Sequence, residues 1–307
     1  MTAATHETGA ATPAAAPARP AVAAAERPRK VRGREERSPW ASVVLHCTLI
    51  LATVIAAFPV VWILFISLGP KNAWQEPGQV LKHLSLHNYS DVLAHSDLAK
   101  WFLNTVIVAG GTTLLGVFLA STAGYAVSRM RFPGSRQLMW TFLVTQMFPS
   151  IVLIVPLYLL MSELHLLDNY FGLILAYATT AVPFCAWMMK GYFDTIPKEI
   201  DEAGRVDGLT PIGTFWRLIV PLAKPGLAVT AFYSFLTAWG EVAYATQFMQ
   251  SDHYTLAVGI RTFAQDQRPD WAWTSATAII ITIPAALVFM LVQRSLVSGL
   301  TAGGTKS

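Results

Sequence analysis

Long apolar stretches separated by shorter polar connections run along most of this chain. A helix needs about 20 mainly apolar residues to cross the hydrocarbon core of a bilayer. Six stretches reach that length, namely residues 43–68, 103–127, 138–161, 170–189, 226–247 and 274–297. The short alternating strands of a membrane barrel are missing from the pattern, and a lipid-exposed backbone otherwise has to be helical. The pattern therefore predicts an all-α membrane protein with six transmembrane helices.

Prolines interrupt several of the predicted helices. They stand at positions Pro59, Pro149, Pro156, Pro183 and Pro284. Each removes one backbone hydrogen bond and favours a kink. Such kinks serve either helix packing or hinge motion, and the sequence leaves both open.

The composition supports lipid as the surroundings of the chain. Hydrophobic residues make up 54% of it and charged residues 13%, whereas ordinary soluble domains carry about 25% charged residues. The two cysteines, Cys47 and Cys185, lie inside apolar runs, and neither they nor the seven histidines show a metal-ligand spacing. We expect packed thiols and no metal site.

The placement of charge predicts the orientation. Lys and Arg concentrate in the cytoplasmic loops of membrane proteins. With a cytoplasmic N-terminus, most of the 22 Lys and Arg residues fall on the inner side. The sequence therefore predicts six spans with both the N- and the C-terminus in the cytoplasm.

The two ends differ in composition from the apolar part. Residues 1–40 are rich in Ala and Pro and then basic, which predicts a disordered cytoplasmic arm. The apolar run after them is too long for the core of a cleaved signal peptide. We expect a transmembrane domain over residues 41–299 and a cytoplasmic tail over residues 300–307.

The longest inner connection, residues 190–224, predicts a short amphipathic helix. Thr195 is placed to cap its start and Gly208 to end it, and a second short helix is expected to end before Pro221. One face is apolar, at Ile196, Ile200, Ala203 and Val206, and the other is charged, at Glu199, Glu202 and Arg205. Such a helix suits either a groove on a soluble partner or the membrane surface, and both remain open.

This loop resembles the EAA loop of ABC importer permeases. The residues that carry the resemblance are Glu202-Ala203-Gly204-x-x-Asp207-Gly208, followed by Leu218-x-Val220-Pro221. The family pattern is E-A-A, three residues, G, nine residues, and then I-x-L-P. Gly204 stands here in place of the second Ala, which weakens a helix by about 1 kcal/mol.

Further motifs are similar to the carbohydrate-uptake branch of these permeases, in particular the smaller permease subunit of maltose/maltodextrin importers. They are Asn104-Thr105, Gly124-Tyr125-Ala126-x-Ser128-Arg129, Arg131-Phe132-Pro133-Gly134, Phe148-Pro149, Lys190-Gly191-Tyr192-Phe193, Tyr254-Thr255-Leu256-Ala257-Val258-Gly259 and the C-terminal Gln293–Lys306. The resemblance covers nearly all of the membrane part and leaves out the first 40 or so residues. It implies the six-helix architecture of type I ABC importer permeases.

The resemblance also implies partners and a mechanism. The EAA helix would dock in a cleft of a cytoplasmic ATP-binding subunit, with contacts from Glu202, Ala203, Gly204, Asp207 and Gly208. The tail residues Thr301, Ala302, Gly303, Gly304 and Lys306 would reach between two such subunits. The assembly would also hold a second permease and an extracytoplasmic solute-binding protein, in the inner (plasma) membrane of a bacterium. Nucleic acid is not an expected partner.

The fuel is expected to come from a partner rather than from this chain. The sequence contains no GxxxxGK[ST] phosphate-binding loop and no recognisable catalytic constellation. We therefore expect that it is not an enzyme and binds no cofactor, and that ATP and Mg²⁺ are held by the partner ATPase subunits.

Polar side chains inside the predicted spans are candidates for the translocation path. They are Asn104, Gln146, Thr237 and Glu241, and polar groups at membrane depth mark either pathways or buried hydrogen bonds. Glu241 is the sharpest case, because it suits either the path or a boundary that water reaches. No residue is assigned to the bound sugar.

The cargo is open within one class. The resemblance favours maltose-like or trehalose-like oligosaccharides, and another sugar, a polyol or glycerol phosphate is the alternative. A secondary transporter is disfavoured because Glu241 is nearly alone as an intramembrane carboxylate and no internal repeat is evident. A membrane scaffold that docks a soluble partner through residues 190–224 is the remaining alternative.

Overall fold

The computed structural model describes residues 39–265 and 270–304, and these residues form helices and turns with no β-strand among them. This agrees with the predicted all-α class. Almost all of the predicted arm at residues 1–40 lies outside the described residues. Pro39 and Trp40 belong to the first helix and not to the arm, because proline fits the first turn of a helix well.

Contacts divide the chain into two compact units, with the boundary between Ala56 and Ala57. The described residues of the first unit belong entirely to helix α1 (Pro39–Ser67), which is apolar over nearly all its length. The second unit carries all the other described elements.

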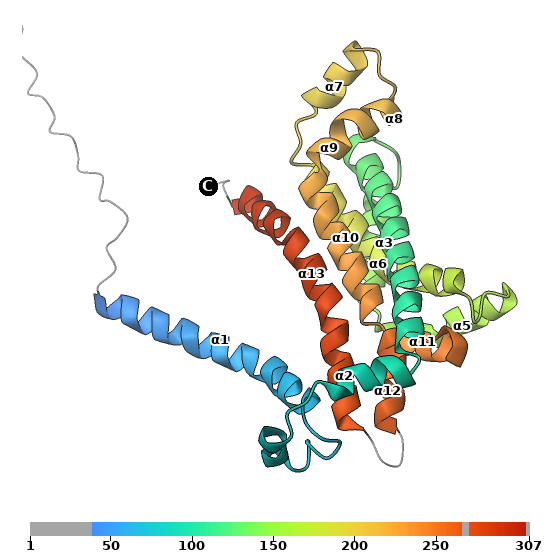
Figure 1. Cartoon of the computed structure of the whole chain (residues 1–307). Coiled ribbons are helices and arrows are strands. Elements are labelled where there is room, and N and C mark those ends of the chain that lie inside the picture. The colour runs from blue at the N-terminus through green and yellow to red at the C-terminus, as the bar shows by residue number, and fades with distance from the viewer. Residues whose placement is uncertain (1–38, 266–269, 305–307) are drawn as a thin grey trace, which may run out of the picture. The chain divides into compact units, whose positions relative to one another are not determined.

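Three helices form the core of the second unit. They are α3 (Leu98–Arg129), α6 (Tyr170–Phe193) and α10 (Lys224–Trp239). Helix α3 runs along α6, and α10 packs against both (Figure 1). A long apolar helix, α13 (Trp271–Gly304), packs against α10.

Small residues let the core helices approach one another closely. A Cβ atom on Gly116 would lie 2.8 Å from the Ser234 hydroxyl oxygen, and one on Gly124 would lie 2.9 Å from the backbone nitrogen of Lys190. Neither position has room for a side chain as the helices now stand. Close approach at small residues is a common way of packing helices in membranes, where lipid supplies no hydrophobic drive between them.

The third predicted span, residues 138–161, is not one straight helix. It consists of α4 (Ser135–Thr145), the 3-10 turn η2 (Ser150–Leu153) and α5 (Ile154–Glu163). The two halves are bent by 100° at the break. Pro149 explains the break, because proline cannot donate to a helix and disfavours helical backbone in the residue before it.

The fifth predicted span, residues 226–247, is also interrupted. Helix α10 ends at Trp239, with Gly240 as its cap, and α11 (Ala243–Phe248) is separate. On its other side, α10 joins a helical segment over residues 211–222 at a bend of 83°. That segment comprises α8 (Pro211–Thr214), the π-helical turn η3 (Phe215–Ile219) and α9 (Val220–Leu222).

Four helices among the described residues are long and apolar enough to cross a membrane, or up to six if each bent pair is one span. The prediction of six spans therefore agrees with the structure if each bent pair is one span. Shorter elements lie at the two ends of the core (Figure 1). At one end is α7 (Glu199–Val206) with α8, and at the other are α2 (His87–His95), α11 and α12 (Leu256–Gln265). The remaining short turns are η1 (Pro77–Lys82) and η4 (Ser251–His253).

Candidate functional site

The predicted loop helix exists as α7, but it begins later than expected. Its first residue is Glu199, and Lys198 precedes it without a side-chain cap. The Thr195 hydroxyl donates to the Tyr192 carbonyl at 2.7 Å instead, so the predicted capping role of Thr195 is wrong. Acidic side chains in the first turn replace a cap, since they interact favourably with the positive end of the helix dipole.

The end of α7 lies where the sequence predicted it. Gly208 has a left-handed backbone with φ of 80°, a conformation that glycine adopts without steric cost. Its N–H donates to the Arg205 carbonyl at 3.0 Å, and the Leu209 N–H donates to the Gly204 carbonyl at 2.8 Å. This pair of bonds is a Schellman motif, which satisfies the last carbonyls of the helix.

The predicted apolar face of the loop helix is divided in the structure. Ile196 and Ile200 pack into the interior of the protein. Ala203 is exposed, and Val206 is exposed to 87%. Glu202 is exposed beside them, as are Glu199 and Arg205, so the outward face of α7 combines charged side chains with a small apolar surface.

The inward positions of α7 are Asp201 and Gly204, both buried. A Cβ atom on Gly204 would lie 2.8 Å from Thr214 Oγ1 and 3.0 Å from Leu218 Cδ1. Helix α7 therefore packs directly on α8 and η3 through the missing side chain. This contact gives a physical reason for glycine at a position where the family pattern has alanine.

The second helix of the loop is longer than predicted. It starts after Thr210, whose hydroxyl accepts from the Gly213 N–H at 3.1 Å. Helical structure continues through Pro221 to Leu222, so the predicted end before Pro221 is wrong. Proline is tolerated there because it lies in the first turn of α9, directly after the π-helical turn.

A buried ion pair joins α7 to the end of α3. Arg129 Nε lies 2.9 Å from Asp201 Oδ2, and the two side chains are 7% and 9% exposed. The Tyr125 hydroxyl donates to Asp201 Oδ1 at 2.6 Å. The Arg129 guanidinium also donates to the Ile196 carbonyl at 2.8 Å. The sequence pointed to Tyr125 and Arg129 only as parts of a motif, and it predicted no role for Asp201.

Aromatic packing surrounds this pair. The ring of Tyr125 lies 4.8 Å from that of Phe215 and 5.7 Å from that of Phe193, measured between centroids. Beside it, the Ser128 hydroxyl donates to Asp194 Oδ1 at 2.6 Å. The motif residues Tyr125, Ser128 and Arg129 thus all contact the start of the α7 loop.

Glu241, the sharpest candidate for the translocation path, has a structural role in the break after α10. Its Oε1 accepts from the Tyr244 N–H at 2.9 Å, and its Oε2 accepts from the Ala245 N–H at 3.2 Å. The carboxylate thereby satisfies amides at the start of α11 that have no partner within the helix. It is half-buried.

Two further path candidates, Gln146 and Thr237, lie apart from Glu241. Gln146 is exposed at the break between α4 and α5, and its amide donates to the Thr180 carbonyl at 3.1 Å. Thr237 is half-buried in α10 and donates to the Tyr233 carbonyl of its own helix at 2.9 Å. Among the described residues, no hydrogen bond joins any two of these three side chains.

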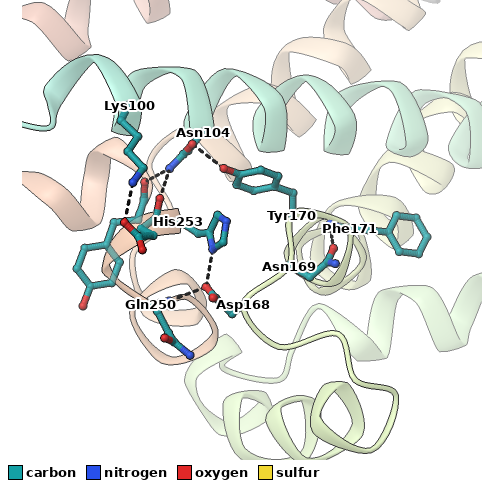
Figure 2. Close-up of polar contacts among 10 residues, drawn as sticks. Lys100, Asn104, Asp168, Asn169, Tyr170, Phe171, Gln250 and His253 are labelled. Atoms are coloured by element: carbon teal, nitrogen blue, oxygen red, sulfur yellow. Dashed lines mark hydrogen bonds and ion pairs between the residues drawn. The ribbon is translucent and has the colours of Figure 1, made fainter.

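Asn104 lies in a second polar cluster, at the Leu98 end of α3. Its side-chain amide donates to the Tyr254 carbonyl at 3.0 Å and accepts from the Tyr170 hydroxyl at 2.7 Å (Figure 2). The neighbouring Thr105 hydroxyl accepts from the Leu256 N–H at 2.7 Å. The Asn-Thr motif and the segment that begins at Tyr254 are therefore bonded to each other.

Charged side chains complete this second cluster. Asp168 Oδ1 accepts from the Gln250 N–H at 2.9 Å and lies 2.8 Å from His253 Nδ1 (Figure 2). Lys100 Nζ donates to Asp252 Oδ1 at 2.7 Å, and this exposed ammonium lowers the pKa of the Asp252 carboxyl. These bonds hold the residues after α11 against the first turns of α3 and α6.

The remaining predicted site falls at the C-terminus. Only the helical backbone is described for Thr301, Ala302, Gly303 and Gly304, and Lys306 lies outside the described residues. Within the described part of the chain, no three His, Cys, Asp or Glu side chains gather in a way that could hold a metal ion.

A family model matches residues 112–301 of the chain, and its description is a binding-protein-dependent transport system inner membrane component. The maltodextrin transport system permease protein MdxG of Bacillus subtilis is 38% identical over 209 residues, which cover 67% of this chain and 75% of that protein. The trehalose transport system permease protein SugB of Mycobacterium tuberculosis is 34% identical over 255 residues, which cover 82% and 93%. The maltose/maltodextrin permease protein MalG of Salmonella typhimurium is 35% identical over 284 residues, which cover 86% and 95%.

Solved structures agree with these relatives. The chain is similar to a crystal structure of a bacterial ABC transporter involved in the import of the acidic polysaccharide alginate, with a TM-score of 0.69 and 25% identity. That match covers 82% of this chain and 95% of the other. A second alginate transporter structure, in complex with a periplasmic protein bound to an alginate pentasaccharide, has a TM-score of 0.60 at 14% identity and supports the fold alone.

Proposed function

The chain belongs to the family of binding-protein-dependent transport system inner membrane components, and from that membership we propose that it is a membrane-spanning permease subunit of an ATP-driven importer of oligosaccharides. The observation that carries the proposal is the family match over residues 112–301, which runs through α7 and both bent helix pairs. The relatives are transport permeases, which supports a role other than catalysis for this chain.

Coupling to ATP would use the outward face of α7. Glu202 is exposed there and free to pair with a basic group of an ATP-binding subunit, while Ala203 and Val206 offer the apolar contact. A short helix of this kind fits a groove on a soluble partner. Asp207 and Gly208 end the helix at the edge of this face. Gly204 lies on the buried side of α7. It would position the helix through its close packing on Thr214 and would not touch the partner.

The proposed assembly contains a second permease subunit, two ATP-binding subunits and an extracytoplasmic solute-binding protein. The family description names dependence on a binding protein, and one structural neighbour was crystallised with its periplasmic protein. ATP and Mg²⁺ would be held by the ATP-binding subunits. The C-terminal residues Thr301, Ala302, Gly303, Gly304 and Lys306 would approach those subunits from the cytoplasmic side.

Oligosaccharides are the proposed cargo because the relatives include permeases for maltodextrin, trehalose and galactooligosaccharides. A different sugar derivative is the second candidate, since another relative transports sulfoquinovosyl glycerol. Of the proposed path residues, Gln146 is the most exposed to a passing solute, at the break between α4 and α5. Glu241 and Thr237 would contribute less, because their side chains already bond to nearby backbone.

The test is ATP-dependent uptake of labelled maltose, maltotriose and trehalose by proteoliposomes that contain the chain and its partner subunits. Glu202→Lys reverses the charge on the outward face of α7, and we expect it to abolish binding of the ATP-binding subunit and uptake together. Glu163→Lys is the matched control, because Glu163 is also exposed but ends α5. Uptake that ignores ATP, or a Glu202→Lys variant that behaves like the control, would overturn the coupling role of α7.

A further inference from the structure

We infer that Tyr125, Arg129 and Asp201 form a buried latch that makes α7 and the end of α3 move as one body, so that a displacement of α7 is delivered to α3. The three residues are called the α3–α7 latch below. The inference rests on the proposed function for the origin of that displacement, which is the ATP-binding subunit docked on α7.

Adjacent acidic residues of α7 face opposite ways. Glu202 is exposed, whereas the Asp201 side chain is only 9% exposed and points at α3. Successive residues of a helix are about 100° apart around its axis, so one turn presents one carboxylate to the outside and the other to the interior. The outward carboxylate suits a partner protein, and the inward one has a partner within this chain.

The latch uses both oxygens of Asp201, one in an ion pair and the other in a hydrogen bond. Oδ2 lies 2.9 Å from Arg129 Nε, and Oδ1 accepts from the Tyr125 hydroxyl at 2.6 Å. The same guanidinium donates to the Ile196 carbonyl at 2.8 Å, just before α7. Arg129 of α3 therefore contacts both α7 and the segment just before it. The ring of Tyr125 packs against the rings of Phe193 and Phe215.

Burial makes it costly to break the ion pair of the latch. If α7 moved without α3, the Arg129 and Asp201 charges would separate in a place that water hardly reaches, and an unpaired buried charge is far more costly than a broken surface pair. Moving both helices together preserves every bond. Ser128 donates to Asp194 Oδ1 at 2.6 Å and so fixes the end of α3 to the end of α6, directly before the α7 loop.

Helix α3 is suited to receive this displacement. It packs along α6 and α10, and at its other end Asn104 and Thr105 bond to the segment from Tyr254 to Leu256. Asp201 and Arg129 are thus positioning residues for transport. They act through the docked face of α7 and do not touch the sugar or ATP.

The first experiment reads the latch in the purified chain alone. Tyr125→Phe keeps the packed ring and removes the hydroxyl that Asp201 accepts from. We therefore expect amide hydrogen exchange in α7 to accelerate by at least roughly tenfold, as for one lost hydrogen bond to a charged group. Tyr192→Phe is the control, since the structure shows no hydrogen bond for that hydroxyl among the described residues. Unchanged exchange in α7 would overturn the latch whatever the fate of the proposed function.

The second experiment measures sugar transported per ATP hydrolysed in the reconstituted complex. We expect Asp201→Asn to retain the ATP-binding subunits, because Glu202 is untouched, and to lower this ratio roughly tenfold. The double variant Asp201→Asn/Arg129→Gln should regain part of the loss, because it removes the unpaired buried charge. A ratio within twofold of the parent for Asp201→Asn, in a complex that Glu202→Lys abolishes, would overturn the latch and leave the proposed function standing.

Discussion

Gly204 shows how much a single missing side chain decides in the α7 loop. The position where its Cβ would stand is 2.8 Å from Thr214 Oγ1. Thr214 is 2% exposed, and its branched side chain has few alternative rotamers. The neighbour can yield only by moving backbone.

Gly204→Ala is therefore expected to destabilise the chain although alanine is the better helix former. Overpacking of this kind costs about 1–3 kcal/mol, which outweighs the helix propensity that alanine gains. The measurement is the thermal unfolding midpoint in detergent. Gly191→Ala is the control, since a Cβ there meets nothing within 4 Å. A Gly204→Ala protein as stable as the parent would show that α7 does not pack as described.

The sequence predicted outward residues of α7 better than inward ones. Glu202 was assigned to a charged face and is exposed, and Gly208 was predicted to end the helix and does. Asp201 was missed because its partner Arg129 is more than 70 residues away along the chain, and periodicity within the loop says nothing about distant charges. The available signal was an acidic pair on a helix together with a basic residue in a motif at the end of another span.

At the scale of elements, the sequence predicted the six apolar stretches but not the breaks within two of them. Hydropathy records how many apolar residues follow one another, and a bend of 100° between α4 and α5 leaves that number unchanged. Pro149 was recognised as a source of kinks, and the structure turns that kink into a break. The break at Gly240 was missed because Glu241 suggested a path residue rather than a helix start.

Glu241 offers a direct test of these two roles. Glu241→Ala leaves the Tyr244 and Ala245 amides at the start of α11 without their acceptor, and loss of a helix cap costs about 1 kcal/mol. We expect faster hydrogen exchange in α11 and a lower unfolding midpoint. Glu241→Gln retains one side-chain oxygen as an acceptor and should recover most of the stability.

Transport assays with the same variants separate the path from the cap. If Glu241 acts as a cap, uptake follows stability, so Glu241→Gln transports nearly as well as the parent. If the charge itself lines the path, both variants lose uptake equally while α11 exchange differs between them. That second pattern would restore Glu241 to the translocation path.

At the scale of the whole molecule, contacts at the two ends of α3 decide how often the chain crosses the membrane. The Tyr170 hydroxyl donates to Asn104 near the beginning of both α6 and α3, and the Ser128 hydroxyl donates to Asp194 where both helices end. The two helices therefore run in the same direction. The bent pair α4–α5 between them has to return the chain from one end to the other.

Helix α10 returns the chain in the same way. Gly226, near its start, lies against the Tyr192 ring at the end of α6, whereas Gln250, after α11, bonds to Asp168 before the start of α6. These contacts favour counting each bent pair as one crossing, and with the candidate spans α1, α3, α6 and α13 the number would be six. Six crossings would place both ends of the chain on one side, which is what the distribution of Lys and Arg predicts.

Cysteine labelling in a background with Cys47→Ala and Cys185→Ala tests this topology. Glu163→Cys lies at the end of α5 and Asp207→Cys directly follows α7, and both positions are exposed. A membrane-impermeant maleimide added outside intact cells should label Glu163→Cys at once and Asp207→Cys only after permeabilisation, because α6 crosses the membrane between them. The reverse pattern, with Asp207→Cys labelled at once and Glu163→Cys only after permeabilisation, would make the α4–α5 pair a re-entrant loop. It would also move α7 away from the side where an ATP-binding subunit could reach Glu202.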